Sequence, residues 1–594
     1  MTSDTKIKKV HHNHHQFTLR MRILRERILS SIKQAHCRLS SKSSDHSSDD
    51  GNSLISSLFW NNNKSNNKSD TATTTTNQSL ISENTRKLLL SETITKDDTD
   101  FKNNFGTLFK QYAHDQGRHE RISYGVRRKI VNRKTLRDLP MLVTCLDMEW
   151  NSFPTVMNAT TMIRRLLSTE RDPPIDEVIQ SGAMAYFAQF LDFNEIQKHF
   201  NVNFLSQVPK LFSQTYKHVQ GKRTITDRQL YDLMLEAAWA MTNVASSTSV
   251  HTRYAVEMGA ISKFIQLIPI EDDEVRSQVI WGLGNIAGDS CAMRDLVLEL
   301  GAIPLLHEEI VRPLNRLSIK RNATWTLSNL LRGTPIVSFE YVKQCLPTID
   351  KLLDESDEEV LTDACWAAFY ASDGPIERLQ ACVDQDFIPK IIKHVKSSLA
   401  AIQTPALRTL GNIITGDDQL TQAVLSENSG EFVKFLPTLL DHPKQSLRKE
   451  TMWVISNIAA GNVSQIQQLI DGGIVTKVIE KLKGDDFSVQ KDGFWALSNI
   501  CDCGSVEQIA YVVKSGGIEQ LIKALHSSEM RVIVVGLEGL KAILQHYFEK
   551  DQSIRDILLQ IEQHGGIDIL ERLESHQSND IFRLAREILD YFDN

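Results

Sequence analysis

Apolar residues recur with helical spacing over most of the chain, and one polar position repeats with them. Seven times, at intervals of about 42 residues, a Trp or Arg is followed four residues later by Asn or Tyr within an apolar stretch. The first members of these pairs are Trp239, Trp281, Trp325, Trp366, Arg408, Trp453 and Trp495. Residues four apart are neighbours on one face of a helix. The period is typical of armadillo-type helical repeats, which stack so that equivalent faces line up along one continuous groove.

A second marker repeats with the same period. A Gly followed by an apolar helix start recurs at Gly259, Gly301, Gly430, Gly473 and Gly517. Asp386 stands where the repeat between Gly301 and Gly430 would place Gly. Gly182 lies one period plus roughly 35 residues before Gly259. The two markers together predict contiguous repeats, with one insertion at about 192–227 within the second repeat.

Composition divides the chain into three regions. Residues 1–100 hold a His tract, a Ser-rich stretch and an Asn/Thr-rich stretch, so they bury too little apolar surface to fold and are expected to be disordered. Residues 101–138 are basic, and residues 139–594 carry the helical array. We therefore predict an all-α protein, with one repeat domain after a low-complexity region and a basic helical segment.

Charge and motifs narrow the function. The 594 residues carry a formal net charge of -7, which gives no nucleic-acid footprint and favours basic partners. The eight Cys lack zinc spacing and favour a reducing compartment, and no apolar run reaches membrane-spanning length. No phosphate-binding loop, metalloprotease motif or nucleophile motif is present. We expect no enzymatic activity, no cofactor, no metal, no nucleic-acid partner and no membrane partner.

Six stretches together resemble one known family. They are RRLLSTERDPPIDEVIQSG from Arg164, WGLGNIAGDS from Trp281, RNATWTLSNLLRG from Arg321, EEVLTDACWAAFYASDG from Glu358, PALRTLGNIITGDD from Pro405 and RKETMWVISNIAAGN from Arg448. In this order they resemble importin α over nearly all of residues 139–594. The resemblance implies a right-handed superhelical solenoid of about ten armadillo repeats, whose concave face binds nuclear localisation signals.

The repeated pairs have a chemistry that suits such a ligand. An Asn amide offers donors and an acceptor, so a ladder of Asn can hold the backbone of an extended peptide without reading its sequence. Slots between consecutive indoles accept the aliphatic stems of Lys or Arg. Core packing alone would not require Asn, which is a poor helix former and is costly to bury unpaired. The repeated Asn therefore favours a binding role for this face.

Two groups of complete pairs predict two peptide sites. The pairs that interrupt them are Trp366 with Tyr370 and Arg408 with Asn412, and the resemblance identifies the groups as major and minor sites. For the major site we predict Trp239, Asn243, Thr252, Trp281, Asn285, Asp289, Trp325 and Asn329, where the resemblance makes Asp289 the acceptor for a Lys ammonium with Thr252 nearby. For the minor site we predict Arg408, Asn412, Glu450, Trp453, Asn457, Asp492, Trp495 and Asn499, with Glu450 and Asp492 as acceptors.

The basic segment resembles the family's importin-β-binding region in diluted form. FKNNFG from Phe101 and VRRKIVNRK from Val126 follow the family order. The candidate binding residues are Arg118, Arg121, Arg127, Arg128, Lys129, Arg133 and Lys134. A solvated basic linker is the alternative interpretation of this segment, and a basic amphipathic helix around Arg20 to Arg38 competes for the same role.

We conclude from the sequence that the chain is a nuclear import adaptor shuttling between cytoplasm and nucleus. Its expected partners are cargo proteins with basic localisation signals, importin β and a recycling exportin, and nucleoporins are possible further partners. The alternative is an armadillo scaffold of catenin or adhesion type without import activity. Such a scaffold would be expected to present Lys and Arg to acidic partners, for which only Arg332 and Arg408 lend themselves.

Overall fold

The computed structural model describes residues 136–169, 172–205, 207–213, 215–549 and 554–593. The predicted disordered region 1–100 and nearly all of the predicted basic segment 101–138 lie outside these residues, as do all seven candidate importin-β-binding residues. The chain divides into two compact units, one ending at Gln278 and the other running from Val279 to Asn594. The sequence predicts a single repeat domain at 139–594, and we describe each unit by itself.

The first unit consists of short helices followed by one long helix in each repeat. Its helices are α5 (Leu139–Thr144), α6 (Phe153–Leu167), α7 (Ile175–Gln180), α8 (Ala183–Phe190), α9 (Phe193–Gln197), α10 (Asp227–Ala245), α11 (Ser249–Glu257) and α12 (Ala260–Leu267). Helix α13 (Asp273–Asp289) contains the boundary between the two units. The long helix α10 packs against α6, the last helix of the preceding repeat.

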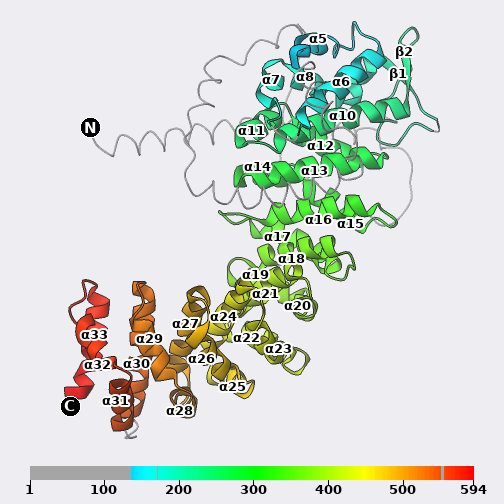
Figure 1. Ribbon diagram of the computed structural model, residues 1–594. Coiled ribbons are helices and arrows are strands. Elements are labelled where there is room, and N and C mark those ends of the chain that lie inside the picture. Colours follow the sequence, from blue (N-terminus) through cyan, green and yellow to red (C-terminus); the bar gives the residue numbers. More distant parts are fainter. Residues whose placement is uncertain (1–135, 170–171, 206, 214, 550–553, 594) are drawn as a thin grey trace, which may run out of the picture. The chain divides into compact units, whose positions relative to one another are not determined.

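The second unit continues the same scheme, and Figure 1 shows its repeats following one another along the chain. Its helices are α14 (Cys291–Glu299), α15 (Ala302–Val311), α16 (Leu317–Leu331), α17 (Phe339–Leu352), α18 (Glu358–Ser372), α19 (Ile376–Asp384), α20 (Phe387–Val395), α21 (Ala400–Ile414), α22 (Asp418–Ser426), α23 (Glu431–Leu440), α24 (Gln445–Ala459), α25 (Val463–Asp471), α26 (Ile474–Gly484), α27 (Phe487–Cys503), α28 (Val506–Lys514), α29 (Gly517–Leu525), α30 (Met530–Glu549), α31 (Ile554–Gln563), α32 (Gly566–Leu573) and α33 (Asn579–Asp593). A 3-10 turn, η2 (Glu427–Ser429), precedes α23. Grouped by period, the described helices form ten repeats.

The repeating Gly has a local structural reason. It stands between the first and second helices of a repeat in the left-handed backbone region, for example at Gly259 with φ 87° and Gly301 with φ 82°. A side chain with a Cβ is disfavoured there, and Asn or Asp tolerates the position better than other residues do. Asp386 takes the same conformation with φ 63°, so it does replace the Gly of its repeat. In the ninth repeat the left-handed residue is Gly516, where the sequence pattern had suggested Gly517.

The core of each unit lies between the second and third helices of successive repeats. In the second unit the third helices pack on one another in the order α16, α18, α21, α24, α27, α30 and α33, and second helices such as α20, α23 and α26 pack on them from one side. Buried Ile, Leu, Val and Ala side chains fill this space. Burial of this apolar surface is the main stabilising contribution. The all-α armadillo-repeat class is therefore confirmed, with one local exception.

The exception is the insertion before α10, which folds as a small ordered element. Strand β1 (Phe200–Asn203) pairs in parallel with β2 (Arg223–Thr226), with Phe200 opposite Arg223. Phe193 stacks on Phe212 with ring centroids 4.2 Å apart. The Tyr216 hydroxyl donates to the Val202 carbonyl oxygen at 2.5 Å. The aromatic residues give this stretch a core of its own, which the expectation of an entirely helical repeat domain had not included.

The insertion is also attached to the helices of its own unit. The Arg223 guanidinium donates to the carbonyl oxygen of Met148 at 2.6 Å and also to that of Asn151, and lies 4.7 Å from the Phe200 ring centroid. Lys263 pairs with Asp192 at 3.3 Å. One cation of the insertion, Arg223, and one of its carboxylates, Asp192, are therefore engaged inside the unit. Among all described residues, no helix is long and apolar enough to cross a membrane.

Candidate functional site

The pairs predicted from the sequence lie on the third helices of the repeats. In the second unit α16, α18, α21, α24 and α27 each carry one pair, and each of these helices packs on the next. The indole-bearing residues Trp325, Trp366, Trp453 and Trp495 are all partly buried, with neither full exposure nor full burial. A half-exposed aromatic face is what a binding slot requires, since a core Trp would be covered on both sides.

The Asn side chains are fixed by the preceding helix. Asn329 Nδ2 donates to the Gly284 carbonyl oxygen at 3.1 Å, and Asn499 Nδ2 donates to the Ser456 carbonyl oxygen at 2.9 Å. Asn412 Nδ2 donates likewise to the Phe369 carbonyl oxygen at 3.3 Å. Each acceptor lies three residues after the first member of the previous pair. One N–H thus orients each amide. Asn499 is partly exposed and keeps its amide oxygen and second N–H for a ligand backbone, whereas Asn412 Nδ2 also donates to Ser372 Oγ at 3.1 Å and Asn329 is only 4% exposed.

Two Asn side chains lack this support. The Nδ2 atoms of Asn285 and Asn457 are buried and have no hydrogen-bond partner among the described residues. A buried amide N–H left unpaired costs about 1–3 kcal/mol. These two residues belong one to each predicted site. Because each Nδ2 atom has almost no exposed surface, it can meet a peptide carbonyl only if the amide turns toward the face.

Glycine allows the indoles to lie directly on the previous helix. A Cβ added at Gly284 would fall 2.2 Å from Cζ3 of Trp325, and one added at Gly411 would fall 2.2 Å from Cζ3 of Trp453. Both glycines lie three residues after the first member of a pair, where the next indole packs on the helix backbone. These two glycines therefore position the indole walls of the slots.

We expect Gly411→Ala to displace the Trp453 indole, because the added methyl group would overlap the ring. Overpacking of this kind costs typically about 1–3 kcal/mol. Thermal unfolding should show lower stability, and the fluorescence of the variant should shift relative to the parent. Gly484→Ala is the matched control, since a Cβ there meets nothing within 4 Å. Equal destabilisation by both changes would contradict a specific role for Gly411.

The two interrupting pairs fill the space that a slot would occupy. The rings of Trp366 and Tyr370 stack with centroids 5.8 Å apart, and Phe369 packs edge-on to Trp366 at 5.7 Å. The Arg408 guanidinium lies 5.6 Å from the Phe369 ring centroid. The protein's own aromatic rings and one guanidinium thus pack on one another between the two groups of complete pairs.

Carboxylates three residues before an indole differ in their environments. Glu450 Oε1 accepts from Arg408 Nη2 at 2.5 Å, so this acid already has a cation. Asp492 makes no ion pair among the described residues, and burial raises its pKa to about 6, with Lys449, Glu450 and Lys491 as its charged neighbours. Of the two acceptors predicted for the minor site, only Asp492 is left for a ligand.

A third carboxylate, Asp363, was not recognised in the sequence. It lies three residues before Trp366, and burial raises its pKa to about 8, with Glu359 adding in the same direction. The signal was present, because Asp363 has the same offset from its Trp as Glu450 and Asp492. Desolvated acids that lack a cation are candidates for binding a basic ligand.

The first unit contains the beginning of the ladder. Asn243 Nδ2 donates to Ser168 Oγ at 2.9 Å, and the Arg164 guanidinium lies 4.1 Å from the Trp239 ring centroid. Thr252 is only 1% exposed, and its hydroxyl donates to the Ala245 carbonyl oxygen at 2.9 Å. Its hydroxyl proton is thus engaged within the fold, which leaves only oxygen lone pairs for the role in cargo binding predicted from the sequence.

Asp289 is the last residue of α13 and is partly buried. Ser290 follows it and accepts a hydrogen bond from the Met293 backbone N–H, so it caps α14. The predicted acceptor therefore lies at a helix junction beside the Trp281 and Asn285 face, with no hydrogen bond or ion pair to its side chain among the described residues.

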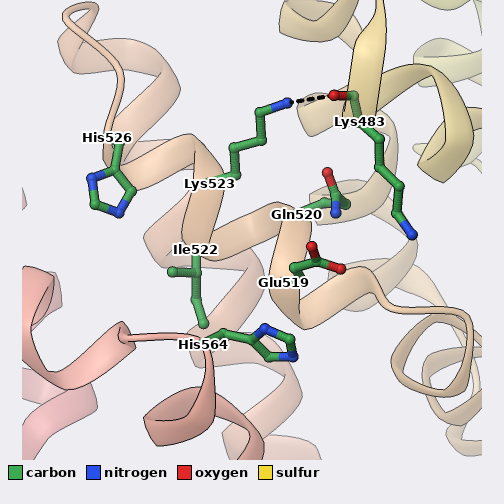
Figure 2. Close-up of a pocket in the computed structure, with 7 residues that line it drawn as sticks. All are labelled: Lys483, Glu519, Gln520, Ile522, Lys523, His526 and His564. Carbon is green, nitrogen blue, oxygen red and sulfur yellow. Dashed lines mark hydrogen bonds between the residues drawn. The ribbon is translucent and has the colours of Figure 1, made fainter.

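A cavity of about 460 Å³ lies elsewhere in the second unit and is shown in Figure 2. Its lining residues are Lys483, Glu519, Gln520, Ile522, Lys523, His526 and His564, none of which belongs to a pair. Lys523 donates to the carbonyl oxygens of Leu482 at 2.5 Å and Lys483 at 3.3 Å. Among the described residues no group of three or more His, Cys, Asp and Glu could hold a metal ion.

Comparisons with known proteins agree on one family. Residues 248–288 match the model of the Armadillo/beta-catenin-like repeat. The chain is 37% identical over 469 residues to importin subunit alpha-1b of Oryza sativa subsp. japonica. This match covers 77% of this chain and 80% of that protein. It is 40% identical over 466 residues to importin subunit alpha-4 of Arabidopsis thaliana, with 77% and 79% covered.

A solved structure supports the assignment of the fold, and of the fold alone. The crystal structure of an engineered protein aligns with a TM-score of 0.63 at 23% identity, over 77% of this chain and 99% of that one. The chain belongs to the importin α family.

Proposed function

We propose that the paired Trp and Asn face binds an extended basic peptide, the nuclear localisation signal of a cargo protein. As a member of the importin α family the chain is a nuclear import adaptor. The observation that supports the proposed site is the combination of partly exposed indoles with the partly exposed Asn499, whose amide is oriented by one hydrogen bond and whose oxygen has no partner among the described residues. Such a face holds a peptide backbone and leaves the side chains to enter the slots.

The preference for basic side chains is proposed to come from the acids that have no cation. A Lys or Arg stem would lie between neighbouring indoles, with the charged end directed to Asp492 at one site and to Asp289 at the other. Charge-assisted hydrogen bonds are roughly twice as strong as neutral ones. Because Arg408 already neutralises Glu450, we assign Glu450 a role in holding Arg408 and not in direct cargo contact.

Two peptides test the division into a major and a minor site. A peptide with two basic clusters should lose affinity several-fold with Trp495→Ala, because one of its clusters loses a slot wall. A peptide with a single basic cluster should depend on Trp325 and be almost unaffected by Trp495→Ala. Isothermal titration calorimetry measures both. If Trp495→Ala weakened the two peptides equally, the interrupting pairs at Trp366 and Arg408 would not divide the face.

The remaining partners are proposed from membership of the family. Residues 101–138 would bind importin β, and retention of importin β by residues 90–140 in a pull-down tests this segment. The last repeats would bind a recycling exportin, and the chain would shuttle between cytoplasm and nucleus, with nucleoporins as possible further partners. The absence of an enzymatic role belongs to the same proposal. The catenin-type alternative is not favoured, because the long matches are to importin α subunits.

A further inference from the structure

Helix α6 and its C-cap residue Ser168 carry a further pair that the repeat pattern did not reveal. Arg164 and Ser168 lie four residues apart, as Trp and Asn do in later repeats. Arg164 Nε donates to Glu236 Oε2 at 2.6 Å, and Nη2 donates to Glu236 Oε1 at 3.1 Å. The same guanidinium lies 4.1 Å from the Trp239 ring centroid. Both charged side chains are largely buried, with 11% of Arg164 and 15% of Glu236 exposed.

The second unit repeats this arrangement. Arg408 stands in the first position of its pair, and its guanidinium binds Glu450, the acid three residues before the next Trp. Glu236 has the same offset from Trp239. In both places an arginine of one repeat neutralises the acid of the next. Asp492 follows a repeat that carries Trp instead of Arg, and it makes no ion pair among the described residues.

Arg164 makes the contacts that are expected of a Lys or Arg side chain from a bound peptide. A guanidinium over an indole face, with two parallel hydrogen bonds to a carboxylate, is the strongest arrangement available to a single Arg side chain. An intramolecular cation also has a high effective concentration, so a peptide Lys or Arg would have to displace it. Ser168 Oγ accepts a hydrogen bond from the Asn243 amide. In later repeats the equivalent Asn amide donates to a backbone carbonyl oxygen instead.

We propose that Arg164 occupies a latent slot formed by Glu236 and Trp239, a slot that would otherwise accept a Lys or Arg side chain of the peptide. Arg164 therefore prevents a further basic side chain of the peptide from binding beside Trp239. The inference rests on the proposed peptide-binding function. It makes Arg164 a specificity-determining residue, which limits the number of basic side chains that contribute to affinity.

The test uses the full chain and fluorescence anisotropy with labelled peptides. One peptide carries a single Lys-rich cluster, and the others extend it at either end by Lys or, as a reference, by Ala. For the parent chain, Lys and Ala extensions should bind equally within twofold. With Arg164→Ala, the Lys extension at one end should bind at least fivefold more tightly than the Ala extension. Arg165→Ala is the control, because the neighbouring Arg165 is exposed and its side chain makes no hydrogen bond or ion pair among the described residues.

Two further results decide the inference. Arg164→Gln keeps a hydrogen-bonding partner for Glu236 and should show the same preference, so it replaces Arg164→Ala if that variant is unstable by circular dichroism. Adding Glu236→Gln to either variant should abolish the gain. If the core peptide binds but Lys and Ala extensions stay equal in both Arg164 variants, the inference is overturned. If no peptide binds the parent chain, the proposed function itself fails.

Discussion

Replacing Trp281 and Asn285 together by Ala should weaken a single-cluster basic peptide by at least about 2 kcal/mol, roughly a thirtyfold rise in Kd. The first change removes the indole wall next to Trp325. The second removes the amide that is expected to hold the peptide backbone at this position. Calorimetry with the full chain measures the loss, and circular dichroism checks the fold.

A control on the same helix separates loss of the pair from a general disturbance of α13. Glu274 lies exposed in the first turn of α13 and belongs to no pair. We expect Glu274→Ala to leave most of the affinity in place. Unchanged affinity of the Trp281 and Asn285 double variant, with an intact helical spectrum, would exclude this face as the binding site.

Reversing the charge of Asp492 should remove the second site. Asp492→Lys places a lysine ammonium where the charged end of a peptide Lys or Arg is expected. Juxtaposed like charges cost several kcal/mol. A two-cluster peptide should therefore fall to the affinity of a single-cluster peptide, a loss of at least about 2 kcal/mol. Glu480→Lys is a control of equal charge change on the exposed surface of α26. If both variants weaken the two-cluster peptide equally, the effect is one of net charge and not of this site.

The pH dependence at Asp492 provides a second measurement on the same residue. Burial raises the pKa of Asp492 to about 6, and a bound cation would lower it again, so the complex holds fewer protons than the free protein. Affinity for a two-cluster peptide should rise as pH increases through about 6 and level off above that value. The stability of the free chain has the opposite sign, because the folded state binds the proton more tightly than the unfolded state, and it should fall over the same range.

Asp492→Asn should remove both slopes, since the amide does not titrate. Its neighbours Lys449, Glu450 and Lys491 remain in place in this variant and supply the background. A slope in peptide affinity that persists in Asp492→Asn would assign the titration to another group.

Much of the fold could be predicted because the markers are local. A Gly or Asp in the left-handed region and an i, i+4 pair on one helix face both leave a fixed period in the sequence, and Asp386 shows that even a substituted marker keeps its conformation. The small sheet of β1 and β2 could not be predicted in this way. It occurs once, its aromatic core joins residues such as Phe193 and Phe212 across an irregular segment, and no periodicity reveals such a contact.

The residue types of the candidate site could be predicted from the sequence. Which of its acids are already paired with a cation could not. Sequence spacing treats Glu450 and Asp492 alike, because both precede a Trp by three residues. Only the packing of neighbouring repeats shows that Arg408 binds the first and leaves the second without a cation. Arg164 escaped notice for a related reason, since the insertion moves it 75 residues from Trp239 and hides it from the period.

Photo-crosslinking of a labelled Lys-rich localisation peptide to the full chain, followed by mass spectrometry, tests most directly whether the paired face is the binding site. We predict cross-links in the third helices of the repeats, on tryptic fragments from α16 for a single-cluster peptide and also from α24 or α27 for a two-cluster peptide. Competition with unlabelled peptide should remove them. Cross-links confined to second helices such as α15, α23 or α26 would contradict the assignment of the Trp and Asn face as the cargo-binding site.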